Sequence, residues 1–192
     1  MNQTATQTEN RTHWPVHDAT TAPEAAKPAL EAVRQRYGAI PNIFGVMAGS
    51  PALLNGYLAL TEAYEGGELT PAQRDVILIA ASMVNGCGYC VAAHSTMSSL
   101  PAEELKALRA GEPLSDPALE ALRRVTRAAV ERQGWVDEAL RSELDAAGLP
   151  ASAAGEILVG VALKTMSNYM NHQAGTPLDS FLAAWAWEPR AE

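Results

Sequence analysis

The chain has 192 residues, of which 47% are hydrophobic, and a net charge of −8 at neutral pH. This length and composition predict one soluble globular domain with enough apolar residues to form a core. The acidic balance argues against nucleic-acid binding, which needs a basic patch to neutralise phosphates. No run approaches the ~20 apolar residues that cross a bilayer. The first residues lack the basic and apolar regions of a secretory signal, so we expect a cytoplasmic protein.

Residues 1–22 are polar and without periodicity, and we expect them to form a disordered or loosely docked arm. Residues 23–192 are expected to form a single domain, divided by Gly, Pro and Asn-Gly turn signals into segments with helical spacing of apolar residues. The predicted helices cover residues 23–37, 40–49, 51–65, 72–84, 87–100, 101–110, 117–133, 137–147, 151–173 and 178–186. No segment shows sustained period-two alternation, so the sequence predicts an all-α fold.

The two halves of the chain share a spacing pattern. In each half an acidic residue begins an apolar run, a polar residue follows twelve positions after the acid, and a second one follows three positions later. The two sets are Asp75, Cys87 and Cys90, and Glu156, Asn168 and Asn171. This echo indicates two related helical halves, with chance similarity between apolar helices as the alternative.

Both cysteines of the chain lie in the motif Cys87-Gly88-Tyr89-Cys90, and His94 follows. Two sulfurs at this spacing can close into a disulfide, and thiolate is the species that reacts. The helix break before Cys87 places this residue near a helix N-terminus, where the thiol pKa can fall from about 8.5 to roughly 7 or lower. His94 lies one turn beyond Cys90 on the same face, so it is placed to accept the Cys90 proton. Exposure at the helix end favours Cys87 as the attacking thiol, whereas the nearness of His94 favours Cys90.

Asp75 is predicted to orient His94. If the helices on either side of Asn85-Gly86 pack antiparallel, Asp75 and His94 lie at similar heights, about ten and about eight residues from the turn. A carboxylate that holds a histidine serving a nucleophile is a recurring arrangement. The predicted catalytic residues are therefore Cys90, Cys87, His94 and Asp75.

Two other readings of the cysteines stay open at this point. Cys87, Cys90 and His94 supply three possible zinc ligands, and a fourth would have to come from Asp75 or His172. The chain has no second C-x-x-C motif to complete such a site. Alternatively, both thiols are small, inert core residues.

The sequence resembles the AhpD-like alkylhydroperoxidases, which are related to carboxymuconolactone decarboxylases. The resemblance covers about residues 30–185, and its core combines the acid, N-G-C-x-x-C and histidine at matching spacing. The matching segments are Asp75-Val76-Ile77-Leu78, Asn85-Gly86-Cys87-Gly88-Tyr89-Cys90, His94, Ile40-Pro41-Asn42-Ile43-Phe44 and Asn168-Tyr169-Met170-Asn171-His172.

The resemblance implies an AhpD-like helical bundle, a homo-oligomer (dimer, trimer or hexamer) and cofactor-free reduction of hydroperoxides. It also implies an external dithiol or lipoyl-type reductant as partner, while the net charge and the lack of a long apolar run predict no nucleic-acid or membrane partner. By position, Cys90 would attack the peroxide, Cys87 would resolve the product, and His94 would accept the proton. Asp75 stands where the family usually has glutamate, and Tyr89 where well-studied members carry histidine.

Two alternative functions remain beside peroxide reduction. One is the cofactor-free decarboxylation of a lactone, the activity of the family's namesake, which does not call for a C-x-x-C pair. The other is a non-catalytic helical module in which Cys87 and Cys90 bind zinc or sense oxidation for a partner.

Overall fold

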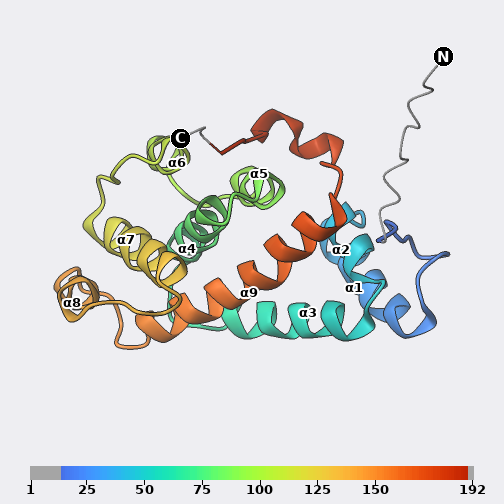
Figure 1. Cartoon of the computed structure of the whole chain (residues 1–192), viewed down its shortest axis with the longest axis horizontal. Helices are drawn as coiled ribbons and strands as arrows, with labels where there is room; N and C mark the ends of the chain where they lie inside the picture. The colour runs from blue at the N-terminus through green and yellow to red at the C-terminus, as the bar shows by residue number, and fades with distance from the viewer. Residues whose placement is uncertain (1–13, 190–192) are drawn as a thin grey trace, which may run out of the picture.

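The computed structural model describes residues 14–189, and this part of the chain is helical and contains no strand (Figure 1). The predicted all-α fold is confirmed. Residues 1–13, within the predicted arm, and 190–192 lie outside the described residues. The elements are η1 (Glu24–Ala26), α1 (Lys27–Tyr37), α2 (Asn42–Met47), α3 (Pro51–Glu65), α4 (Pro71–Val84), α5 (Gly88–Thr96), α6 (Ala102–Ala110), α7 (Pro117–Glu131), α8 (Glu138–Ala146), α9 (Ala153–Ala174) and η2 (Ser180–Trp185). Among residues 14–189, no helix is long and apolar enough to span a bilayer.

Helix α9 runs through the middle of the described structure and joins two clusters of buried apolar side chains (Figure 1). The first cluster lies mainly among α4, α6, α7 and α8, and α9 contributes Ile157 to it. The second lies among α1, α2, α3, α5 and η2, and α9 contributes Met170. Both cysteines belong to this second cluster, so the C-terminal half of α9 lies against them.

Side-chain caps explain why two of the long helices begin where the sequence predicts. The Ser50 hydroxyl accepts the N–H of Leu53 at the start of α3. Thr70 and Gln73 form a reciprocal capping box at the start of α4. Each cap is followed by proline at the first helical position, where the missing N–H costs nothing. Such caps typically stabilise a helix by about 1 kcal/mol.

The helix that carries the cysteines is shorter than predicted. The sequence predicts a helix over residues 87–100, but α5 spans Gly88–Thr96, and Cys87 is its extended N-cap residue. Beyond the helix, the carboxylate of Asp75 accepts the N–H of Ser99 at 2.7 Å, which holds the chain in a non-helical turn. The last predicted helix, 178–186, is the 3-10 helix η2.

The described end of the predicted arm packs against α2. The N–H of His17 donates to the carbonyl of Gly45 at 3.1 Å, and Ala22 is buried. A Cβ at position 45 would lie 2.5 Å from the His17 carbonyl oxygen, so this close contact requires glycine. Residues 14–22 are therefore docked on the domain.

The two halves that share a spacing pattern differ at the turn. Helix α4 ends at Val84, and the chain turns before Cys87, whereas α9 continues without a break through Asn168 and Asn171. The duplication stays a prediction. The structure does place the second polar pair directly against the first, because both asparagines contact the turn that carries the cysteines.

Helix α9 crosses α3 and α4 closely at Gly160. A Cβ at this position would lie 2.5 Å from Cγ2 of Ile77 and 3.0 Å from the hydroxyl of Tyr64. We therefore expect Gly160→Ala to lower the free energy of unfolding by about 1–3 kcal/mol in urea denaturation, because the added methyl overpacks the crossing.

Gly155→Ala is the matched control in the same helix, since a Cβ there meets no atom within 4 Å. Alanine has the higher helix propensity, so this control should raise the free energy of unfolding by up to about 1 kcal/mol. Equal effects of the two substitutions would contradict the close crossing.

Candidate active site

The turn between α4 and α5 positions the two sulfurs. Gly86 adopts a left-handed conformation with φ of +70°, which ends the run of α4 and redirects the chain. The N–H of Cys87 then donates to the carbonyl of Ser82 at 2.9 Å. Cys87 caps α5, Cys90 follows one turn later, and their sulfur atoms lie 3.7 Å apart as free thiols. The predicted sulfur pair is thus assembled and needs only a small movement to form a disulfide.

Polar groups of α9 face the sulfur pair from the opposite side. The Asn171 amide donates to Sγ of Cys90 at 3.3 Å and to Sγ of Cys87 at 3.6 Å. Sγ of Cys90 also lies 3.6 Å from the Ser167 hydroxyl. The Asn168 side chain, one residue along, accepts from the amide of Asn85 and so ties α9 to the turn. Cys87 and Cys90 are only 2% and 4% exposed, so these groups replace water around the sulfurs.

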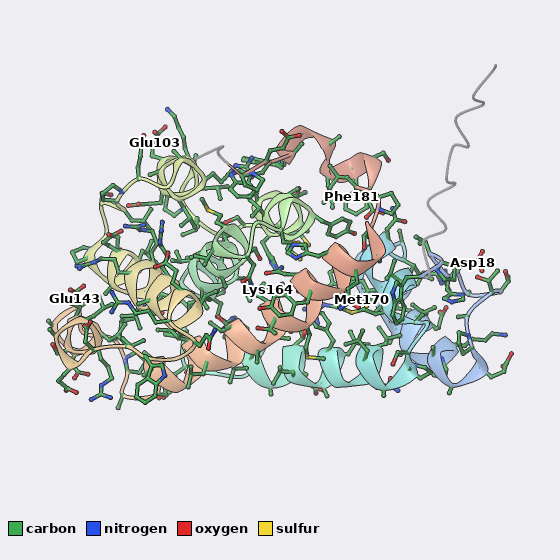
Figure 2. All side chains as sticks on the ribbon, viewed as in Figure 1. Asp18, Glu103, Glu143, Lys164, Met170 and Phe181 are labelled. Atoms are coloured by element: carbon green, nitrogen blue, oxygen red, sulfur yellow. The ribbon has the colours of Figure 1, made fainter. Side chains whose placement is uncertain are left out.

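Lys164 is the site residue that the sequence analysis missed. Its side chain is 1% exposed, on the part of α9 that lies beside α4 and α5 (Figure 2). Its Nζ lies 2.6 Å from Nε2 of His94 and 3.5 Å from the Tyr57 hydroxyl, and it makes no ion pair with any carboxylate of the described residues. A buried ammonium without a counter-ion is costly and is a typical mark of a functional site. The sequence signal was available, because Lys164 is the only charged residue between Glu156 and His172.

The charges of the site favour a thiolate at Cys90. The Cys87 thiol and then the Lys164 ammonium lower the pKa of Cys90 to about 5, although burial acts in the other direction. The hydrogen bond given to Cys90, together with burial, raises the pKa of Cys87. One sulfur is therefore suited to attack and the other to remain protonated until it is needed.

His94 has Lys164 as its partner. Loss of solvent around the ring, and then the charge of Lys164, hold the pKa of His94 well below its usual value. Burial also acts to lower the pKa of Lys164, but the charges of Tyr57 and Cys90 outweigh it and raise that pKa. The histidine is therefore neutral, and its Nε2 accepts a hydrogen bond from the ammonium. Among the described residues, neither sulfur makes a hydrogen bond with His94.

Asp75 lies near His94 but has a different partner. The turn at Asn85 brings Asp75 beside the end of α5, where it accepts the Ser99 N–H, and both Asp75 and His94 line one cavity of about 390 Å³. No hydrogen bond joins the two side chains in the described structure. Burial raises the pKa of Asp75. The hydrogen-bond partner of the Asp75 carboxylate is therefore the Ser99 N–H, and the predicted role of Asp75 in orienting His94 stays a prediction.

The other candidate residues make no hydrogen bond with either sulfur in the described structure. Among residues 14–189, no group of three His, Cys, Asp or Glu side chains is arranged to hold a metal ion. His172, considered as a fourth ligand, is exposed and stacks on Tyr169 with ring centroids 6.4 Å apart. Tyr89 donates its hydroxyl to Asp179 at 2.5 Å and accepts the N–H of Ile43. The zinc site considered from the sequence is therefore not formed in this structure.

Residues 179–189, which we name the C-terminal strap, lie across α5 (Figure 1). One end is held by the bond from Tyr89 to Asp179, and the other by Arg109, which donates to the carbonyl of Ala186. The carbonyl oxygen of Trp187 lies 2.5 Å from the position that a Cβ at Gly88 would occupy. The strap therefore covers the turn of α5 that begins at Cys87.

A cavity of about 310 Å³ opens beside Cys90, and its lining includes five Phe and Tyr side chains, so we name it the aromatic cavity. Its polar lining includes Ser167, which contacts Cys90, together with Lys164 and His94. The site can therefore present one thiolate and one ammonium to a small molecule bound against an apolar wall.

The comparisons with known proteins concern the family and the fold of the chain. The sequence profile of the Carboxymuconolactone decarboxylase family matches residues 51–128, which include the cysteines and His94. Comparison with curated proteins finds no match. The solved structures similar to the chain include an uncharacterized peroxidase-related protein from Ralstonia eutropha JMP134, described as an alkylhydroperoxidase AhpD core. It is 22% identical, the match covers 92% of this chain and 97% of that chain, and the TM-score is 0.77.

Two further structures share the fold. The debrominase Bmp8, solved in complex with 2,3,4-tribromopyrrole, is 18% identical, with 92% of this chain and 96% of that chain covered and a TM-score of 0.75. An uncharacterized peroxidase-related protein from Silicibacter sp. TM1040 is 19% identical, with 88% and 91% covered and a TM-score of 0.70. At these identities the likeness shows the fold, which agrees with the resemblance seen in the sequence.

Proposed function

We propose that the chain is a member of the AhpD-like family related to carboxymuconolactone decarboxylases and that it reduces hydroperoxides through Cys87 and Cys90. The observation that carries this proposal is the sulfur pair itself: two reduced thiols 3.7 Å apart, with the buried Lys164 beside Cys90. The low pKa of Cys90 supplies a thiolate at neutral pH, and the aromatic cavity gives a small peroxide access to it.

The proposed cycle has three steps. The Cys90 thiolate attacks the outer oxygen of ROOH, the O–O bond breaks, and the alcohol ROH leaves after taking one proton. The resulting Cys90 sulfenic acid condenses with the Cys87 thiol, which forms the disulfide and releases water. An external dithiol then reduces this disulfide by thiol–disulfide exchange and is itself oxidised to a disulfide. The net reaction converts ROOH and one dithiol into ROH, water and one disulfide.

Lys164 and His94 would manage the proton in the first step. Two N–H groups of the ammonium are used by His94 and Tyr57, which leaves the third for a ligand in the aromatic cavity. This group can donate a proton to the departing alkoxide, while Nε2 of His94 accepts a hydrogen bond from Lys164 and orients it. The proton released when the external dithiol regenerates the Cys90 thiolate restores the ammonium. Asp75 would act as a positioning residue, since it holds the chain that follows α5.

The partners follow from the chemistry. A dithiol is required because the cycle consumes two electrons for each peroxide, and a lipoyl-type group or a small dithiol supplies both. We retain the cytoplasm as the proposed location, since a reducing compartment keeps Cys87 and Cys90 reduced between turnovers. We also retain a homo-oligomer as the proposed assembly. In this setting the protein would act as an antioxidant peroxidase.

The direct test is consumption of tert-butyl hydroperoxide with dihydrolipoamide as the reductant. We expect Cys90→Ser to fall to the uncatalysed rate, because serine provides no thiolate. Cys87→Ser should consume about one equivalent of peroxide and then slow at least about tenfold, because the sulfenic acid has no resolving thiol. Circular dichroism of both variants checks that the fold is retained.

Other outcomes would favour the alternative functions. Turnover of carboxymuconolactone that persists in a variant lacking both sulfurs would support the decarboxylase. Stoichiometric zinc that is lost with Cys87→Ser would support the binding module. Peroxide consumption equal in the wild type and in both single variants would eliminate the proposed cycle.

A further inference from the structure

Five of the eleven aromatic residues of the chain line one cavity. Both phenylalanines and three of the five tyrosines line the aromatic cavity beside Cys90. These residues come from α1, α2, α3, α5 and η2, so the cavity depends on the folding of distant segments. The five are Tyr37, Phe44, Tyr57, Tyr89 and Phe181. Such a concentration of rings in a chain with few aromatic residues points to a ligand that rings bind well.

The inner wall is built from rings that pack on one another. Tyr37 and Phe44 are stacked with centroids 5.6 Å apart, and Phe44 meets Tyr57 edge to face at 6.0 Å. Both arrangements are favourable and directional, so they fix the faces of the rings that form the wall. The wall is therefore preformed and offers ring faces and edges to a bound molecule.

The opposite side of the cavity leaves apolar surface uncovered. Phe181 on the strap is 54% exposed and Met97 after α5 is 53% exposed, although both line the cavity. Figure 2 shows Phe181 on the strap near α5. A ligand in the cavity would remove part of this apolar surface from water, and this burial would favour binding.

The polar groups of the cavity lie with Cys90, and none of its lining residues is acidic. Lys164 supplies an N–H without a carboxylate partner, and Ser167 a hydroxyl. A fitting ligand thus has one oxygen-bearing end, which lies against the ammonium and Cys90, and an apolar body. The volume of about 310 Å³ is near the lower limit of the range of roughly 300–1000 Å³ for ligand sites, so the body is small.

We infer that the preferred substrates are aralkyl hydroperoxides, in which the carbon bearing the O–OH group also carries an aromatic ring. This inference rests on the proposed function and names its substrate class. The ring binds against Phe44, Tyr57 and Phe181, and the peroxide oxygens lie between Cys90 and Lys164. Hydrogen peroxide lacks the body that the rings bind, and a long acyl chain exceeds the cavity.

The test compares two hydroperoxides that differ in one group. Cumene hydroperoxide carries a phenyl ring where tert-butyl hydroperoxide carries a methyl group. We expect kcat/KM for cumene hydroperoxide to exceed that for tert-butyl hydroperoxide by about 10- to 100-fold, because burial and ring contacts act on the phenyl group alone. The kcat/KM values for hydrogen peroxide and for linoleic acid hydroperoxide should be lower than the value for cumene hydroperoxide by at least the same factor. Equal values for the two matched substrates would overturn the inference and leave peroxide reduction in place.

Substitution of Phe181, an exposed ring of the cavity, tests whether the preference for the phenyl substrate arises in the cavity or elsewhere in the molecule. We expect Phe181→Ala to bring the ratio of the two kcat/KM values close to one. Trp135→Ala is the control, because Trp135 is 83% exposed and does not line the aromatic cavity, and it should keep the wild-type ratio. If the ratio of the two kcat/KM values is unchanged in Phe181→Ala, the phenyl ring of the substrate does not bind against Phe181.

Binding without turnover distinguishes failure of this inference from failure of the proposed function. The probe is 2-phenyl-2-propanol, the alcohol product of cumene hydroperoxide, with tert-butanol as the matched control, titrated into the Cys90→Ser variant by NMR. Tighter binding of the phenyl alcohol supports the aromatic ligand class even if no peroxide is consumed by the wild type. Equal binding of the two alcohols overturns the inference.

Discussion

Replacing Lys164 with methionine is expected to lower kcat/KM for a hydroperoxide by about 10²–10³-fold. Methionine has a similar length and suits a site that is 1% exposed, so the substitution removes the charge and keeps the packing. The variant loses both the ammonium that stabilises the thiolate and the donor for the leaving alkoxide. Loss of one preorganised donor at a developing charge typically costs this much. Steady-state peroxide consumption gives the value.

The pH dependence separates this role from a structural one. The pKa of Cys90 is about 5 in the wild type, so its thiolate fraction falls only as the pH drops through that value. Without the charge of Lys164 the pKa of Cys90 should rise toward its ordinary value of about 8.5. As the pH is lowered, the variant should therefore lose its rate and its thiolate absorbance near 240 nm at a higher pH than the wild type does.

Lys106→Met is the control for charge in general. Lys106 is exposed on α6 and pairs only with Glu103, so its removal should leave the rate and the titration of Cys90 unchanged. If Lys164→Met titrates like the wild type and keeps its rate, Lys164 is merely a buried lysine and the thiolate is stabilised by Cys87 and the polar groups of α9.

Removal of residues 186–192 is expected to speed the reaction of the sulfur pair with a disulfide reagent by about 10- to 100-fold. In the full chain a reagent reaches Cys87, which is 2% exposed, only when the strap opens locally. The truncation removes the Trp187 carbonyl above Gly88 and the bond from Arg109 to Ala186, so the covered state is lost.

The measurement is the rate of reaction with 5,5′-dithiobis(2-nitrobenzoic acid) under native conditions. A chain that ends at Pro189 keeps the strap contacts described above and is the control. Equal rates for the full chain and for the chain that ends at Trp185 would show that the strap does not limit access. Hydrogen exchange of α5 amides gives a second measure of the same opening.

Much of the fold was predictable because its signals are local. Ser50 and Thr70, each followed by proline, mark the starts of α3 and α4, and Gly86 marks the turn before the cysteines. The sulfur pair was predictable for the same reason, since a C-x-x-C motif at a helix start brings two sulfurs together without long-range contacts. The end of α5 was not, because Asp75, 24 residues away, decides it by holding the Ser99 N–H.

Lys164, which was missed, and His94, whose partner differs from the predicted one, have contacts that are set by the packing of α9 against α5. Lys164 acts on Cys90 only because α9 crosses α5, and no local pattern gives that crossing. Once the two helices meet, the ammonium takes Nε2 of His94, which the spacing alone had assigned to Cys90. Sequence reasoning thus located the residues of α5 and singled out Asn168 and Asn171 of α9, but it did not find Lys164 or Ser167 on the same helix.

Helix α9 has one further consequence, which concerns heat and denaturants. It contributes to both apolar clusters, and the same helix carries Lys164, Ser167 and Asn171. Because one helix joins both clusters, we expect the reactivity of Cys90 and the helical signal in circular dichroism to be lost in the same transition on heating.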